Sequence, residues 1–340
     1  MTRPPRPTTR MHTDEFLEPK ILIVSGKGGV GKTTVSAALA LVAARHGRKV
    51  CIAEVDRKGT LPKLFGGREL TYDPTELLPD VWGLNIVPEE SLAEYLRVQY
   101  HMRRISKVFT STHFVDYITT AAPGLKDILV LGKIWYLEQN RSGASPQDFD
   151  TIVVDAPAAG HMLTFFSAPT GLADAVRVGP IRRQSEWLVD MLRDPKRTRV
   201  HLVTLAEEMP VSETLETSDA LVNKLGMSQG AVFANSVYSP LFTQEEEGQL
   251  DELDGSRRFE NMLIESRGVG LSIDGDDLRG LIRYARFLTA RRRIQEQHLK
   301  QLRRGAGQPV VNLPFLFSAG LALPDIETLA DVIEEKVEDL

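Results

Sequence analysis

Two lysines and a threonine lie in a glycine-rich segment near the start of the chain, where they could bind phosphate groups. The segment follows the apolar run 21–24 and reads Ser25-Gly26-Lys27-Gly28-Gly29-Val30-Gly31-Lys32-Thr33-Thr34. This spacing is that of a P-loop between a strand and a helix. Glycines permit the tight turn that aims backbone N–H groups at phosphate oxygens, and the helix adds its positive N-terminal end.

The segment therefore predicts a nucleoside triphosphate site. Lys32 should reach the β- and γ-phosphates, and the Thr33 hydroxyl should ligate Mg²⁺. The expected nucleotide-binding residues here are Gly26, Gly28, Gly29, Val30, Gly31, Lys32, Thr33 and Thr34. Lys27 departs from the ordinary motif because it places a second cation beside the same phosphates. Two such lysines repel each other unless the anion is present.

Two aspartates follow apolar segments that we interpret as strands. Asp56 comes shortly after the segment 49–54, and Asp155 follows 151–154. In a doubly wound sheet such strand ends meet at the edge that binds ligands. Asp155 should hold Mg²⁺ through a water molecule. Asp56 could orient the attacking water, while Lys27, Lys32 and Mg²⁺ neutralise the developing charge, because phosphoryl transfer needs little else from the protein.

Further apolar segments alternate with helical patterns along the chain. Strands that are apolar on both faces and alternate with helices indicate an α/β fold with a doubly wound, mainly parallel sheet. We predict one P-loop ATPase domain over 19–340, with a helical subdomain from about 89–140 and 171–194. The other expected elements are strands at 200–205 and 230–235 and helices at 35–46, 211–225, 276–304 and 325–340.

Composition narrows the class of protein. The 340 residues carry a net charge of −5 and a single cysteine, Cys51, which excludes a disulfide within the chain. The apolar segments are too short to span a membrane. Residues 1–18 are rich in Pro, Arg and Thr and have no apolar core, so we predict a disordered tail and not a secretion signal. The cytoplasm is the expected location.

The loop with its extra lysine resembles that of the arsenical-pump ATPases, the guided-entry ATPases that target tail-anchored proteins, the ParA and MinD proteins and nitrogenase iron protein. The segment 155–169 narrows the resemblance to the first two, which form one family. Asp155, Gly160, His161 and Pro169 match the family's second switch segment. Alanines and a methionine stand where the family has threonines, and one proline comes a position early.

This resemblance implies specific roles for several residues. Lys27 would cross a dimer interface and touch the partner's nucleotide, which implies a homodimer or a heterodimer with a related ATPase. Asp56 matches the aspartate that activates water in the first switch, although Gly59 stands where a histidine is usual. Asn235 would recognise adenine, and a late loop containing Pro314 and Phe315 would pack on it. The implied cofactors are ATP and Mg²⁺.

The single cysteine limits what the resemblance implies. A zinc clamp needs a Cys-x-x-Cys pair from each subunit, and the metalloid site of the pump ATPases needs several cysteines. The chain therefore resembles the zinc-free bacterial members, which share the segment seen here at 122–127. An iron–sulfur scaffold would need at least two cysteines per subunit. A hydrophobic protein client bound on a helical surface remains the favoured role.

A ParA- or MinD-like partition or positioning ATPase is the alternative. Arg291, Arg292 and Arg293 could contact nucleic-acid phosphates, but acidic and amide residues interrupt the run, as on a solvated helix face. The last helix is acidic and therefore a poor membrane anchor. We expect neither nucleic-acid binding nor stable membrane insertion.

Overall fold

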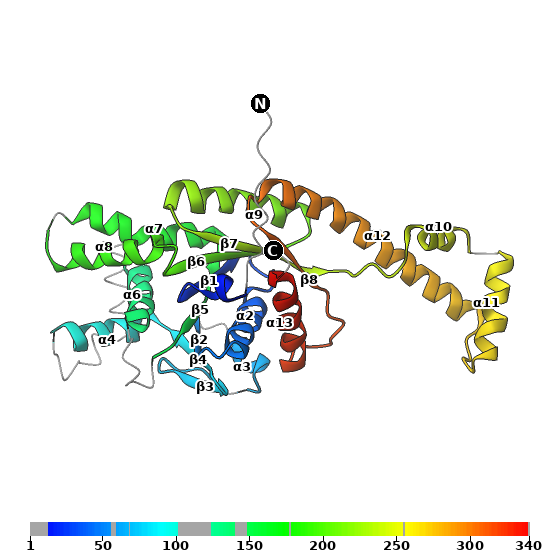
Figure 1. The fold of residues 1–340 in the computed structure, drawn as a ribbon, viewed down its shortest axis with the longest axis horizontal. Helices are drawn as coiled ribbons and strands as arrows, with labels where there is room; N and C mark the ends of the chain where they lie inside the picture. The colour runs from blue at the N-terminus through cyan, green and yellow to red at the C-terminus, as the bar shows by residue number, and fades with distance from the viewer. Residues whose placement is uncertain are drawn as a thin grey trace, which may run out of the picture.

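An eight-stranded sheet forms the centre of the molecule (Figure 1), in the order β3-β4-β2-β5-β1-β6-β7-β8. The computed structural model describes residues 13–55, 59–67, 69–100, 124–139, 148–176, 178–253 and 256–338. All neighbouring strands are parallel except β3 and β4, which form an antiparallel pair at one edge. The strands are β1 Ile21–Gly26, β2 Val50–Val55, β3 Thr75–Leu78, β4 Val81–Ile86, β5 Thr151–Ala158, β6 Thr198–Leu205, β7 Gln229–Val237 and β8 Val310–Pro314.

Helices cover both faces of this sheet. The helices are α1 Thr13–Leu17, α2 Lys32–Arg45, α3 Leu61–Leu64, α4 Pro88–Tyr100, α6 Leu125–Gln139, α7 Ala159–Ala175, α8 Pro180–Arg193, α9 Glu208–Ala220, α10 Gln244–Glu252, α11 Arg257–Gly268, α12 Gly275–Gly305 and α13 Leu323–Glu338. One face packs against α1, α2, α3 and α13, and the other against α6, α7, α8, α9 and the end of α12. The central strands β1 and β2 are buried along their whole length. The predicted α/β fold with a doubly wound, mainly parallel sheet is confirmed.

The C-terminal edge of the sheet differs from the prediction. The segment expected to be a late loop over adenine is partly strand, because Asn312 and Pro314 belong to β8. Its register pairs Ala234 of β7 with Asn312. Only Phe315 lies beyond the strand, and its N–H donates to the Val237 carbonyl at 2.9 Å. A proline is tolerated at this position because β8 is an edge strand and Pro314 is its last residue.

Residues 13–17 correct the prediction of a disordered tail over 1–18. These residues form α1, and the side chains of Phe16 and Leu17 are 1% and 0% exposed. Arg48 donates to the Leu17 carbonyl at 2.8 Å, which fixes the end of the helix. Two buried apolar side chains are enough to hold one helical turn against the body of the protein. Residues 1–12 lie outside the described part of the chain.

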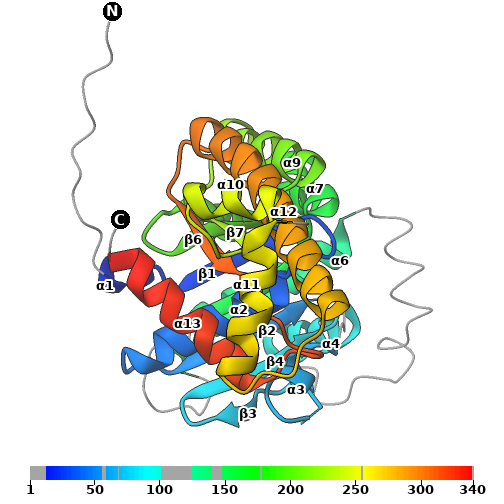
Figure 2. The ribbon, with the colours of Figure 1, turned by 90° about the vertical axis from the view of Figure 1, so that its right-hand side faces the viewer.

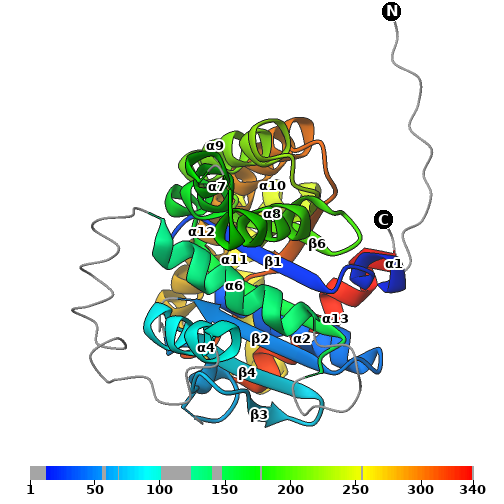
Figure 3. The same cartoon turned by 90° about the vertical axis from the view of Figure 1, so that its left-hand side faces the viewer.

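The helices in the two segments predicted to form a helical subdomain lie together on one side of the molecule (Figure 3). Tyr95 of α4 donates to Gln184 of α8 at 2.8 Å, and the buried Lys133 of α6 bonds Glu94 of α4 at 2.8 Å. The inner sides of α6 and α8 share one core with the sheet. These helices are therefore a layer on the sheet, which α4 extends outward. Residues 101–123 of this segment lie outside the described part.

A part of the chain between β7 and β8 forms a projection that we call the arm, consisting of α10, α11, the first half of α12 and the segments that join them (Figures 1 and 2). Its own small core contains Leu253, Phe259, Leu278 and Ile282. The second half of α12 returns to the sheet, where Leu299 is fully buried. The sequence pattern predicts a helix at 276–304 but does not show that half of it leaves the body.

A buried histidine beneath α1 makes stability depend on pH. His201 of β6 packs against Phe16 and Phe233, with ring centroids 4.8 and 5.7 Å away. Burial, together with the nearby charge of Arg199, lowers the pKa of His201 to about 3. The unfolded chain therefore binds more protons than the folded chain between about pH 6.5 and 3, so stability falls as the pH falls through this range.

We expect the free energy of unfolding to lose about 2 kcal/mol from this residue between pH 7 and pH 5. In His201→Gln, which cannot titrate, the slope of unfolding free energy against pH should be correspondingly smaller. Urea unfolding at several pH values measures both slopes. Equal slopes in the two proteins would show that His201 does not cause the dependence.

Candidate functional site

The turn between β1 and α2 has the conformation that the glycine pattern predicts. Gly26 has φ 155°, and a Cβ atom there would collide with the Val203 carbonyl of β6. Gly31 has φ 95°, and a Cβ atom there would collide with the side-chain amide of Asn235. These two positions exclude any side chain for different reasons, backbone on one side and a buried amide on the other. The loop is thus held at both ends, whereas Gly28 and Gly29 between them are exposed.

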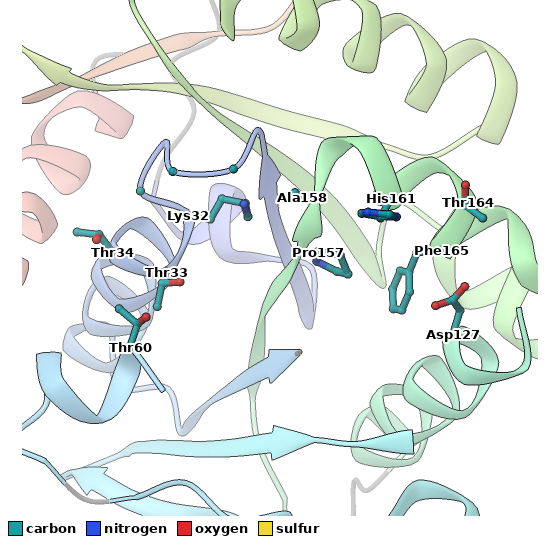
Figure 4. Close-up of a pocket in the computed structure, with 13 residues that line it drawn as sticks. Lys32, Thr33, Thr34, Thr60, Asp127, Pro157, Ala158, His161, Thr164 and Phe165 are labelled. Carbon is teal, nitrogen blue, oxygen red and sulfur yellow. The ribbon is translucent and has the colours of Figure 1, made fainter. Parts of the chain in front are cut away.

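Lys32 lies at the open N-terminus of α2. The N-cap residue of α2 is Gly31, which has no side chain to cap the helix, so the first N–H groups of α2 can bind an anion. Lys32 is buried, and its ammonium donates to the Lys27 carbonyl at 3.1 Å. A phosphate at this position would meet a cation and a helix N-terminus together, as the P-loop prediction requires. Figure 4 shows the Lys32 side chain directed into the cavity below the loop.

The two predicted magnesium ligands touch each other. The Thr33 hydroxyl donates to Asp155 Oδ2 at 2.7 Å. Asp155 is fully buried in β5, although that strand continues past it to Ala158. A hydroxyl and a carboxylate are the hard oxygen donors that Mg²⁺ prefers in proteins, together with water and phosphate oxygens. The residues present therefore fit this ion, and the ion would be held between α2 and β5.

A cavity of about 730 Å³ opens beside the loop (Figure 4). This volume lies within the range of nucleotide and other small-molecule sites. The loop and α2 form one wall, Thr60 closes one end, and α6 and α7 form the opposite wall. The lining residues are Gly28, Gly29, Gly31, Lys32, Thr33, Thr34, Thr60, Asp127, Pro157, Ala158, His161, Thr164 and Phe165.

The second switch segment reaches the cavity through the start of α7. His161 and Thr164 are exposed on its first turns, and Phe165 is buried beneath them. Asp127 faces the same space from α6 (Figure 4). The sequence motifs do not predict a role in the site for any of these four residues. All four nevertheless lie inside the two segments, 122–127 and 155–169, in which the sequence resembles the family.

The three residues expected at adenine lie at the carboxyl ends of β7 and β8, outside the lining of the cavity. Asn235 is buried and donates to the Val30 carbonyl of the loop at 2.9 Å. Phe315 stacks on Tyr238 with ring centroids 4.8 Å apart, beside Pro314. The contact of Asn235 braces the loop, a role that the sequence does not reveal. Recognition of adenine by these residues stays a prediction.

Lys27 also lies outside the cavity lining. Its ammonium contacts the Glu213 carboxylate of α9 at 2.6 Å. Sequence reasoning missed Glu213, and no motif marks it. Asp56, the other predicted catalytic residue, lies outside the described residues. Just after it, the Gly59 N–H approaches the buried Glu54 carboxylate at 3.4 Å.

Thiol chemistry has no support in this site. Cys51 is fully buried in β2, and burial raises the pKa of its thiol far above the ordinary value. Among the described residues, no three His, Cys, Asp or Glu side chains gather in a way that could hold a metal ion by themselves. An ion at Thr33 and Asp155 would therefore depend on phosphate and water for its remaining ligands.

Comparisons with known proteins agree with this geometry. The family model described as anion-transporting ATPase matches residues 19–185. The ATPase BagA of Mycobacterium tuberculosis is 32% identical over 289 residues, which cover 82% of this chain and 83% of the relative. The arsenical pump-driving ATPase of Escherichia coli is 24% identical over 242 residues, covering 66% of this chain and 40% of that protein. The chain belongs to the ArsA family of P-loop proteins and is an ATP hydrolase.

Proposed function

We propose that this ATPase is magnesium-dependent and works as a dimer, either with a second copy or with a related ATPase. In this proposal, ATP closes the dimer and so controls a helical surface that binds a hydrophobic protein client in the cytoplasm. The observation that carries most weight is the position of its two loop lysines. Lys32 faces the phosphate cavity, whereas Lys27 points away from it toward α9.

The residues around the cavity could support hydrolysis without forming a covalent bond to the substrate. Lys32 and the N–H groups of the loop would bind and orient the β- and γ-phosphates. Thr33 and Asp155 would hold Mg²⁺, which when bound neutralises charge on the phosphate oxygens. Asp56 would orient the attacking water, as the family resemblance implies. Each of these acts through position and charge, which is what phosphoryl transfer requires.

The dimer would supply the remaining cation. Lys27 does not line the cavity of its own protomer. We therefore expect each Lys27 to neutralise negative charge at the nucleotide bound by the other protomer. Such a lysine resembles an arginine finger supplied in trans, which joins the reaction only when two chains meet. Hydrolysis would then require closure, and the conformation of the dimer would report which nucleotide is bound.

The proposed client surface lies on α4, on α8 and on the residues just before α8. Four large apolar side chains there are substantially exposed: Val98, Val178, Ile181 and Trp187. The Trp187 ring stacks on Trp135 of α6 at 5.3 Å, with an interplanar angle of 6°. The arm, however, exposes more: Met262, Ile264, Val269, Leu271, Leu281, Tyr284 and Phe287. Tyr100 and Phe109, which we also expect in the client region, have no described side chains.

The partition or positioning alternative receives less support. The arginines that could contact nucleic acid form ion pairs with glutamates, such as Arg293 with Glu247 at 2.8 Å and Arg292 with Glu296 at 3.0 Å. The apolar face of α13 is buried against α2, including Ile333, so it cannot insert into a membrane. None of the helices in the described residues has the length and hydrophobicity needed to cross a bilayer.

Substitution of the two lysines should affect different steps, ATP binding for Lys32 and ATP hydrolysis for Lys27. Lys32→Ala should weaken ATP binding by about 10- to 150-fold, because a charged hydrogen bond to phosphate contributes about 1.5–3 kcal/mol and Lys32 provides at least one. Lys27→Ala should bind ATP nearly normally but hydrolyse it at least about 100-fold more slowly, as expected for a cation that acts in trans. Calorimetry and phosphate release measure the two quantities. A similar loss of affinity in both variants would contradict the separate roles.

The contact between Thr33 and Asp155 predicts the response to magnesium. Thr33→Ala should raise the Mg²⁺ concentration for half-maximal hydrolysis about ten-fold, because one charge-assisted oxygen contact is lost. Thr33→Ser keeps the hydroxyl and is the matched control, so it should stay within about two-fold of wild type. Titration of Mg²⁺ at saturating ATP compares them. Equal shifts in the two variants would remove the hydroxyl from ion binding.

The client surface should be exposed in one nucleotide state. An environment-sensitive apolar dye should bind more strongly with a non-hydrolysable ATP analogue than with ADP, because large exposed apolar patches usually mark a binding site. Trp187→Ser should reduce this difference. Phe287→Ser on the arm, a comparably exposed aromatic position, should leave it unchanged. Dye binding that ignores the nucleotide, or a loss only in Phe287→Ser, would contradict a client surface on α8.

A further inference from the structure

The ion pair of Lys27 joins the nucleotide loop to α9 within one protomer. The ammonium and the Glu213 carboxylate are 2.6 Å apart, and their side chains are 36% and 37% exposed. The two residues are 186 positions apart in the sequence. The proposed function needs the same ammonium at the nucleotide of the other protomer. Glu213 and a phosphate are both anions and repel each other, so an ammonium that binds the partner's phosphate has to leave the carboxylate that it contacts at 2.6 Å in this conformation.

We propose that Glu213 is a positioning residue that holds Lys27 in the nucleotide-free protomer and must release it before the dimer closes. This inference rests on the proposed dimeric function, and it adds a regulation of that site. Glu213 acts as a latch: its carboxylate competes with the partner's phosphate for Lys27. ATP-driven closure exchanges one anion for the other.

The two sides of the latch differ in rigidity. On α9, Val211, Thr214 and Thr217 are buried around Glu213. Ser218 of the same helix donates to Gln229 of β7 at 2.7 Å, which ties α9 to the sheet. Lys27, in contrast, precedes two exposed glycines, whose backbone can adopt more conformations than that of other residues. The carboxylate therefore stays in place, and the lysine is the part that can move.

ATP binding can release the latch through Lys32. In the described conformation the Lys32 ammonium donates to the Lys27 carbonyl at 3.1 Å, so Lys27 is held at its backbone as well as at its side chain. A phosphate that takes over the Lys32 ammonium removes the backbone contact. The half-exposed ion pair with Glu213 is then the contact that must still be broken. The nucleotide in one protomer thus prepares the lysine that serves the other.

The size of the effect follows from the exposure of the pair. Half-exposed ion pairs contribute little to a folded conformation, so removing this one should favour closure by up to about five-fold per protomer. A latch of this strength delays closure without preventing it. Glu213→Gln keeps the size of the side chain and removes the charge. Glu216→Gln, an exposed position three residues later on α9, is the matched control.

The test measures dimerisation by light scattering as ATP is titrated, together with kcat, KM and the unfolding temperature without nucleotide. Glu213→Gln should lower the ATP concentration for half-maximal dimerisation two- to five-fold, and lower KM, while kcat and the unfolding temperature change little. Glu216→Gln should match wild type. In a Lys27→Ala background the Glu213→Gln substitution should have no effect, because the latch has already lost its other half.

The outcomes separate this inference from the function on which it rests. If no protein dimerises with ATP, the dimeric function falls and the latch falls with it. If wild type dimerises but Glu213→Gln behaves like Glu216→Gln, only the latch is wrong. A higher ATP requirement in Glu213→Gln would mean that Glu213 supports the closed state, which also overturns the latch. So would an effect of Glu213→Gln that persists in the Lys27→Ala background.

Discussion

The packing of β1 between β5 and β6 is the constraint on which the site depends. At the end of β1, Gly26 lies so close to the Val203 carbonyl of β6 that no side chain fits. On the other side, Ser25 donates to the Pro157 carbonyl of β5 at 2.9 Å. These contacts fix where the loop begins, and so where α2 presents Lys32 and Thr33. Asp155 then lies within hydrogen-bond distance of Thr33 because its strand is the neighbour of β1.

The charged side chains of the loop have different partners from the buried charges elsewhere in the molecule. Two buried charges elsewhere are paired, Lys133 with Glu94 and Glu138 with Arg197, and breaking such pairs would leave a desolvated ion. The loop lysines are treated differently. The Lys32 ammonium donates to a backbone carbonyl, for which a phosphate oxygen could substitute. The Lys27 ammonium pairs with the half-exposed carboxylate of Glu213. Neither contact is a buried ion pair, which suits the proposal that these two residues respond to a nucleotide.

Local patterns in the sequence predict the centre of the molecule well, because few residue types fit the loop and the buried strands there. Gly26 and Gly31 have no substitute, and the apolar strands predict a parallel sheet. The prediction is wrong at α1, where a Pro- and Arg-rich segment ends in the buried Phe16 and Leu17. The antiparallel β3–β4 edge and the helices α10 and α11 of the arm are not among the elements that the sequence pattern predicts. Glu213 meets Lys27 only through the fold, so no local pattern could indicate that contact.

The central claim is that Lys27 of one protomer completes the site of another. Mixing two inactive proteins tests it most directly. Lys27→Ala keeps Asp56, and Asp56→Asn keeps Lys27, so a mixed dimer contains one site with both groups if the lysine acts across the interface. Phosphate release should then return on mixing, at ATP concentrations where each variant alone is inactive. A mixture that stays as inactive as its components would contradict the claim.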